Sequence, residues 1–213
     1  RYMRESSHWA NHLERPRNFI SGSFNHSNAE TVAVLGSGWL LDVPLDKLLS
    51  RFKQIYLVDI HHPVQIRKKT AGMKQIELIE EDLTGGAIEQ IWLLLKEHTN
   101  LRPDGDLSDL ISLKAPLAQI NPDALISVNL LNQLDIILCD YIRKQRHFQQ
   151  STLTPFRAAI QAFHLNWIQK KPACLITDVR EELWDKSDAK TSKDLIHTDL
   201  PHGSRRDNWW WDF

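Results

Sequence analysis

The run Thr31-Val32-Ala33-Val34-Leu35-Gly36-Ser37-Gly38 carries the clearest structural signal in the chain. Its first five residues are apolar or β-branched and uncharged, which is typical of a strand buried on both faces of a parallel sheet. The glycines that follow permit a sharp turn and a close ligand approach, because they lack a Cβ. The sequence therefore predicts a central strand that ends in a ligand-binding turn.

Further apolar runs of this kind alternate with helical patterns along the chain. Such alternation predicts a parallel sheet covered by helices on both faces. We expect one doubly wound α/β domain with a mostly parallel sheet. The predicted strands are 31–35, 54–58, 75–79, 124–128 and 173–177. The predicted helices are 45–52, 64–71, 87–98, 130–146 and 155–169.

Two segments lie outside this alternation. Residues 2–13 have the pattern of a helix that packs across the front of the domain. Residues 100–121 form a long, proline-containing stretch, and its length suggests a functional insertion or lid. All 213 residues are therefore expected to form a single domain with one added helix and one insertion.

Composition narrows the class of protein. The formal net charge is -1, without the basic face that nucleic-acid binding needs, and we expect no nucleic-acid partner. No apolar run approaches the roughly 18 residues of a membrane span. Cys139 and Cys174 lie among aliphatic residues without metal-ligand spacing, so we expect two buried free thiols and no metal site. These features, with no visible signal peptide, predict a cytoplasmic protein.

Polar or small residues follow the predicted strands, at the edge where parallel sheets bind ligands. Asp59, at the end of the second strand, can accept hydrogen bonds from both hydroxyls of a ribose. Asp82, after the third, is placed to meet the exocyclic amine of adenine. The pattern indicates an adenosine-containing cofactor, although both acids could instead cap the helices that follow them. The full set at the strand ends is Gly36, Ser37, Gly38, Asp59, Asp82, Asn129 and Asp178.

The turn also discriminates between adenosine cofactors. The dinucleotide pattern G-x-G-x-x-G requires a third glycine where this chain has Leu41. Asp42 adds a negative charge where the phosphates of a dinucleotide would lie. S-adenosylmethionine has no phosphate and carries a sulfonium and an ammonium group. The acidic turn therefore favours S-adenosylmethionine.

Five stretches resemble the class I S-adenosylmethionine-dependent methyltransferases: VAVLGSGWLLDVPL at 32–45, IYLVDIHH at 55–62, IELIEEDLTG at 76–85, DALISVNLLNQL at 123–134 and ACLITDV at 173–179. The resemblance implies that the glycine turn holds the methionine part, Asp59 the ribose and Asp82 the adenine. It also implies that residues 127–131 line the cofactor. For the fold, it implies a sheet of about seven strands whose last two are antiparallel, a pair that 195–198 and 208–211 could supply. The expected cofactor-binding residues are Gly36, Ser37, Gly38, Asp59, Ile60, Asp82, Leu83 and Asn129.

The resulting hypothesis is a methyltransferase that acts on an unknown small-molecule or protein acceptor. The alternatives are a nicotinamide-dependent oxidoreductase and a non-catalytic, methyltransferase-like cofactor-binding or scaffold module. Catalytic residues are not identified by the sequence. His61 and His62 could reach the pocket or lie in a helical turn, and His8 and His12 lie one helical turn apart. Trp209, Trp210 and Trp211 could form a core or an aromatic wall for the acceptor.

Overall fold

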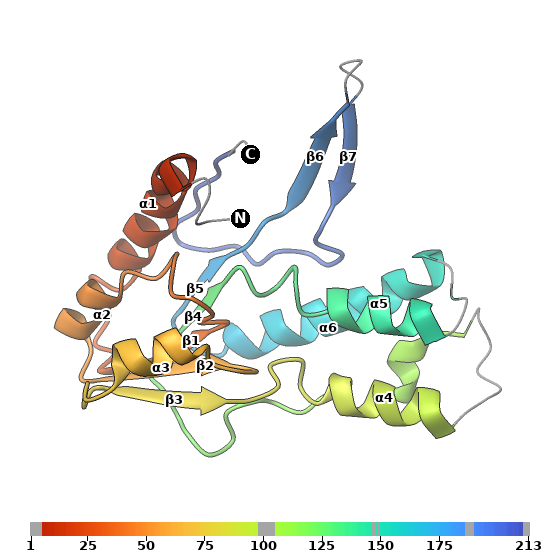
Figure 1. The fold of residues 1–213 in the computed structure, drawn as a ribbon, viewed down its shortest axis with the longest axis horizontal. Coiled ribbons are helices and arrows are strands. Elements are labelled where there is room, and N and C mark those ends of the chain that lie inside the picture. The colour runs from red at the N-terminus through yellow and green to blue at the C-terminus, as the bar shows by residue number, and fades with distance from the viewer. Residues whose placement is uncertain (1–5, 98–104, 146–147, 149, 186–189, 211–213) are drawn as a thin grey trace.

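The computed structural model describes residues 6–97, 105–145, 148, 150–185 and 190–210, with the side chains of all of these except 6–11 and 150. A five-stranded parallel sheet occupies the centre (Figure 1). The strand order is β3-β2-β1-β4-β5, so the predicted first strand is the middle one. The five predicted strands are confirmed as β1 (Thr31–Leu35), β2 (Gln54–Asp59), β3 (Ile76–Glu80), β4 (Ala124–Val128) and β5 (Ala173–Ile176).

The central strand β1 pairs in parallel with β2 and β4, and Val34 lies opposite Leu57 and Ile126. Its residues from Val32 to Leu35 are fully buried. Successive side chains of a strand point to opposite faces of the sheet, and helices cover both faces. Val32 and Val34 pack in the core that includes residues of the first three helices, and Ala33 and Leu35 in the core that includes residues of the last three. The helices are α1 (Ser6–Ser23), α2 (Leu45–Arg51), α3 (Val64–Thr70), α4 (Ala87–Glu97), α5 (Ile136–Gln145) and α6 (Gln150–Ile168).

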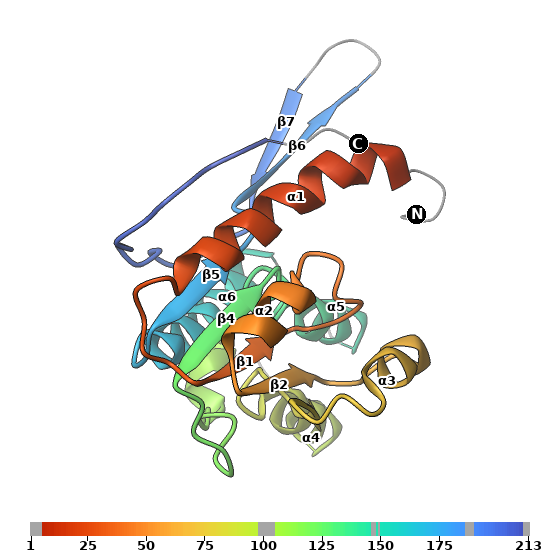
Figure 2. The same cartoon turned by 90° about the vertical axis from the view of Figure 1, so that its left-hand side faces the viewer.

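The prediction of about seven strands in one sheet is wrong. The sheet has five strands, and the last two strands, β6 (Arg180–Trp184) and β7 (Lys190–Asp194), form a separate antiparallel ribbon. Figures 1 and 2 show this ribbon projecting from the body of the molecule. The predicted pair is also misplaced, because 195–198 and 208–210 form no strand and residue 211 lies outside the described residues. Ion pairs join the two strands of the ribbon. Arg180 Nε lies 3.0 Å from Asp194 Oδ1, and Lys190 Nζ lies 2.7 Å from Glu182 Oε1.

The N-terminal helix is longer than the prediction of 2–13. It continues through Pro16 to Ser23, because Ile20 on its last turns and Phe24 just beyond its end are buried against the sheet. Figure 2 shows α1 crossing one side of the domain. Among the described residues, no helix has the length and apolar character needed to cross a membrane. Cys139 and Cys174 are buried and free, as predicted.

The described part of the predicted insertion, residues 105–121, contains one short 3-10 helix, η2 (Leu107–Leu110), which contacts α6. Leu107 and Leu117 are buried in the core. The loop is also tied to the body, because Lys114 N–H donates to the Gly85 carbonyl at 3.0 Å. Most other residues of this part are exposed or half-buried, and residues 100–104 lie outside the described residues. Its role as a lid stays a prediction.

Candidate functional site

A pocket of about 440 Å³ lies at the carboxyl ends of the parallel strands. The chain leaves β1 toward β2 on one side and later returns to place β4 on the other, so the strand order reverses here. Ligands of open α/β sheets bind at such a switch point. The structure brings all eight predicted cofactor-binding residues into the wall of this pocket: Gly36, Ser37, Gly38, Asp59, Ile60, Asp82, Leu83 and Asn129. Their contact with a ligand stays a prediction.

The glycine turn needs its glycines. Gly36 has a φ of 71° and Gly38 a φ of 46°, both in the left-handed region that most residues avoid. A Cβ at Gly36 would lie 3.0 Å from Leu130 Cβ and 3.3 Å from the Val128 carbonyl oxygen. The turn is therefore pressed closely against the end of β4.

Asp59 joins this turn to the end of β2. Its Oδ2 accepts a hydrogen bond from Gly38 N–H at 2.8 Å, and its Oδ1 accepts one from Ile60 N–H at 2.8 Å. A carboxylate has about four acceptor positions on its two oxygens. Each oxygen of Asp59 thus keeps room for one more donor from the pocket, which suits two neighbouring hydroxyl groups.

Two polar atoms beside the turn are buried without a hydrogen-bond partner among the described residues: Ser37 Oγ and Asp42 Oδ1. Ser37 is only 3% exposed. The other oxygen of Asp42 accepts a hydrogen bond from Asn129 Nδ2 at 2.8 Å. Burial raises the pKa of Asp42, and the Asn129 hydrogen bond and Arg17 oppose that rise. Since an unpaired buried polar atom costs free energy, these atoms suit a ligand that carries hydrogen-bond donors.

Asp82, at the end of β3, combines both interpretations that the sequence allowed. Its Oδ1 accepts hydrogen bonds from Thr84 N–H at 2.8 Å and from the Thr84 hydroxyl at 2.5 Å. Thr84 in turn accepts a hydrogen bond from Ala87 N–H at 3.1 Å, at the start of α4. Asp82 therefore supports the beginning of a helix, as the capping interpretation expected. Its Oδ2 has no partner among the residues that the structure describes, and the side chain lines the pocket.

Apolar side chains also border the pocket, and several are exposed despite their size. Trp39 is 56% exposed, Ile60 61% and Ile137 76%. Exposed apolar side chains around a concave site suit a flat organic ring. The sequence analysis missed Trp39 and Ile137. Trp39 could have been predicted from its position in the turn, directly after Gly38.

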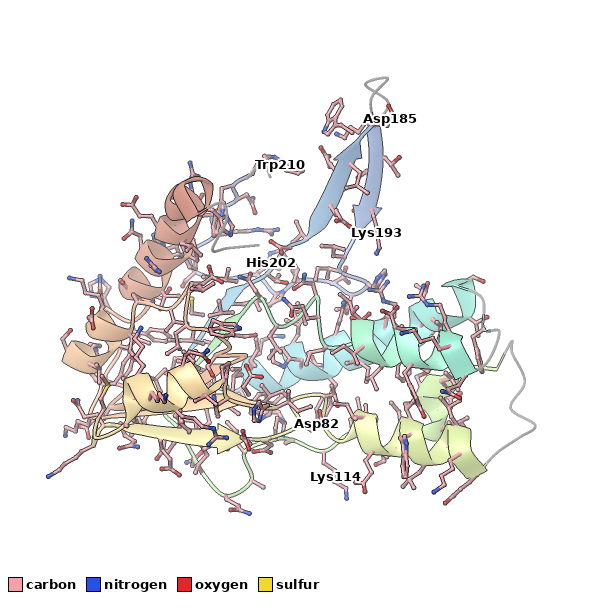
Figure 3. All side chains as sticks on the ribbon, viewed as in Figure 1. Asp82, Lys114, Asp185, Lys193, His202 and Trp210 are labelled. Atoms are coloured by element: carbon pink, nitrogen blue, oxygen red, sulfur yellow. The ribbon has the colours of Figure 1, made fainter. Side chains whose placement is uncertain are left out.

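A second, larger cavity of about 2080 Å³ adjoins the first, and Asn129, Gln133 and Ile137 line both. Residues of α1, the end of β5, the ribbon and the C-terminal segment line it. Lys193, His202 and Trp210, labelled in Figure 3, belong to this lining. Asp178, which follows β5, lines it too. Burial raises the pKa of Asp178, and the nearby charges of Asp42 and Glu181 raise it further.

The two histidines after Asp59 line neither cavity. His62 is fully buried, and its Nε2 lies 3.1 Å from the Ile79 carbonyl oxygen. His61 Nδ1 lies 2.9 Å from Glu80 Oε1 on the surface. The structure therefore gives both residues structural contacts and places neither where it could act on a ligand.

The remaining aromatic and histidine candidates differ in where they lie. Trp209 packs against the core on the α1 side of the sheet, Trp210 is 68% exposed, and both line the larger cavity. Trp211 and the side chain of His8 lie outside what the structure describes. Among the described residues, no group of three or more histidine, cysteine or acidic side chains could hold a metal ion.

Comparison with protein-family models, with curated proteins and with solved structures finds no match to this chain. The function must therefore be argued from the chemistry of the two cavities.

Proposed function

We propose that the 440 Å³ pocket binds S-adenosylmethionine and that the protein is a methyltransferase. One observation carries this proposal: four carboxylates line the pocket, and no lysine, arginine or histidine does so among the described residues. The four are Asp42, Asp59, Glu81 and Asp82. A pocket with this charge repels phosphate and attracts a cation. S-adenosylmethionine supplies two cationic groups and no phosphate.

The pocket offers a partner for each polar part of that molecule. The unpartnered Ser37 Oγ and Asp42 Oδ1 suit the ammonium group, because both can accept hydrogen bonds. The free acceptor positions of Asp59 suit the two ribose hydroxyls, and Oδ2 of Asp82 suits the adenine amine. Ile60 and Trp39 provide apolar surface for the ring. The volume lies within the roughly 300–1,000 Å³ of small-molecule sites.

The chemistry asks little of the protein beyond positioning. When bound, the cofactor supplies an activated methyl group. Holding a donor and an acceptor in line can lower the activation barrier by up to roughly 7–11 kcal/mol. Asn129 and Gln133 line both cavities, so a donor in the smaller one would lie beside an acceptor in the larger one. The turn, Asp59 and Asn129 would hold the donor in that orientation.

The nicotinamide alternative fits the pocket less well. A dinucleotide would place two phosphates near Asp42, whose Oδ1 is already buried without a partner. A carboxylate oxygen without a donor there opposes a pyrophosphate, which needs N–H donors or cations. The non-catalytic alternative predicts the same binding as the methyltransferase and differs only in turnover.

Thermal unfolding with S-adenosylmethionine, S-adenosylhomocysteine and NAD in parallel tests the proposal. A ligand at about 100 times its dissociation constant stabilises the folded state by about 2.7 kcal/mol. For a domain of this size, the melting temperature should rise by roughly 5–10 °C. A rise with either sulfur compound supports the proposal, and a rise with NAD alone would support the oxidoreductase. Binding without methyl transfer to a broad acceptor panel would support the non-catalytic module.

A further inference from the structure

The larger cavity begins where the proposed donor pocket ends. Asn129, Gln133 and Ile137 belong to both walls, so the two cavities adjoin at these side chains. Its volume of about 2080 Å³ is well above the roughly 300–1,000 Å³ of sites that enclose small molecules. A cavity of this size suits a segment of polypeptide.

The part of the cavity beside Asn129 is acidic. Asp178 is largely shielded from water, and its carboxylate forms no hydrogen bond or ion pair with a described residue. Asp42 and Glu181 lie close enough to act on it electrostatically. Lysines and arginines line other parts of the cavity, but none of those described pairs with Asp178, and Arg180 pairs with Asp194 across the ribbon at 3.0 Å. The negative charge of Asp178 is therefore left for a ligand.

The ribbon that borders the cavity has features of a peptide-docking element. Within the described part of the chain, each of its two strands has one unpaired edge, and an extended peptide can add to such an edge through main-chain hydrogen bonds. Leu183 and Trp184 on the ribbon are 59% and 64% exposed, and both line the cavity. A two-stranded ribbon is marginally stable alone in water, so an added strand would stabilise it.

We infer that the larger cavity receives an extended polypeptide segment, and that a lysine or arginine side chain of this segment reaches the Asp178 carboxylate. This inference rests on the proposed function, because it names the acceptor of the methyl group. The ribbon and the exposed tryptophans contact the segment, and Asp178 selects a cationic side chain beside the donor.

Asp178 would also take up a proton. A protonated nitrogen has no lone pair for attack, so it must first lose a proton, which the carboxylate accepts. The nitrogen then bonds to the methyl carbon, the carbon–sulfur bond breaks, and its electron pair stays on sulfur. The new methylammonium or methylguanidinium group carries the positive charge that the sulfonium had. Atoms and charge balance without a further reactant.

The test uses a library of random nonapeptides whose central residue is fixed as lysine, arginine, glutamine or glutamate, applied to the full chain without cofactor. Lysine- or arginine-centred peptides should be enriched over glutamine-centred ones, and their dissociation constants follow from fluorescence anisotropy. Asp178→Asn should weaken the best basic peptide about tenfold. Glu181→Gln should weaken it less, because Glu181 is exposed. The control is Asp199→Asn, which removes the same charge from an exposed acid that does not line the cavity, and should leave the affinity unchanged.

The stabilisation of Asp178→Asn by S-adenosylhomocysteine, measured alongside, shows that the variant is folded and that its donor pocket is intact. Equal enrichment of glutamine-centred and basic peptides, or no bound peptide at all, would overturn the inference. So would a basic peptide that binds wild type and Asp178→Asn equally. If the wild type binds S-adenosylhomocysteine but shows one of these results, only the inference about the acceptor is contradicted. If the wild type does not bind S-adenosylhomocysteine, the proposed function itself is contradicted.

Discussion

The backbone N–H of Gly38 donates a hydrogen bond of 2.8 Å to Oδ2 of Asp59. This bond joins the turn after β1 to the end of β2 across 21 positions of the chain. Asp59 consequently has two tasks in the proposed site. It holds the glycine turn in shape, and it offers its remaining acceptor positions to the ligand.

Substitutions of Asp59 separate these two tasks. Asp59→Asn keeps an acceptor for Gly38 N–H but places an NH2 group opposite Ile60 N–H, so the melting temperature without ligand should fall, though less than in Asp59→Ala. Its affinity for S-adenosylhomocysteine should fall about tenfold, because hydrogen bonds to a charged group are worth about 1.5–3 kcal/mol. Asp59→Ala should lose both the turn contact and nearly all ligand stabilisation. Quenching of tryptophan fluorescence, with Trp39 at the pocket, measures the affinity. Unchanged affinity in both variants would show that the ribose is held elsewhere.

Two glycines test the packing of the 105–121 segment. Gly85 and Gly72 both have positive φ, of 75° and 82°. A Cβ at Gly85 would lie 2.8 Å from Phe163 Cε1 and 2.9 Å from the Lys114 carbonyl oxygen, whereas one at Gly72 meets nothing within 4 Å. Gly85→Ala should therefore reduce the free energy of unfolding by about 1–3 kcal/mol more than Gly72→Ala. Urea denaturation measures both, and equal losses would contradict this packing.

His164 should make the protein acid-sensitive. Its ring is 1% exposed, and Nε2 lies 2.9 Å from Ser127 Oγ. Burial lowers the pKa of His164 from 6.5 to about 4. The unfolded chain thus binds a proton below pH 6.5 that the folded chain refuses until about pH 4, so stability is lost as pH falls through this range.

At pH 5 this loss from His164 amounts to about 2 kcal/mol. His164→Gln should have a shallower dependence of the free energy of unfolding on pH between 7 and 5. The exposed His202, replaced by glutamine, should keep the slope of the wild type. Identical slopes for all three proteins would contradict a neutral, buried His164.

The two thiols should resist alkylation in the folded state. Burial raises the pKa of Cys139 to about 12 and that of Cys174 to about 11. Only the thiolate reacts, so iodoacetamide at pH 8 should modify neither cysteine in buffer and both in concentrated urea. Mass spectrometry of the intact protein gives the count. Rapid modification of either cysteine in buffer would contradict its buried position.

The sheet was predictable because its strands are buried on both faces and therefore appear as continuous apolar runs. The run 124–128 coincides with β4, which is buried throughout. The ribbon was not predictable in this way, since Arg180–Trp184 and Lys190–Asp194 are mostly charged or polar. Its pairing depends on cross-strand contacts such as Arg180 with Asp194, which no local pattern reveals. The helix expected at 130–146 begins only at Ile136. Turns occupy the residues before it, and some of these residues line the pocket.

The part of the candidate site that lies at the ends of the strands was predictable from the sequence. Acids and small residues after β1, β2, β3 and β4 converge because parallel strands end at one edge of the sheet. The contact of Asn129 with Asp42 spans 87 positions, and it depends on the tertiary fold. The same holds for the electrostatic contact of Asp178 with Asp42 and for the second cavity. Only the three-dimensional arrangement shows that the described lining of the 440 Å³ pocket contains acids but no bases.

Isothermal titration of the full chain with S-adenosylhomocysteine, with NAD as a competitor, tests the central claim most directly. We predict one binding site per chain, displacement by S-adenosylmethionine and no displacement by NAD, because the pocket presents four carboxylates. The absence of binding by either sulfur compound, or displacement by NAD at a comparable concentration, would contradict the account.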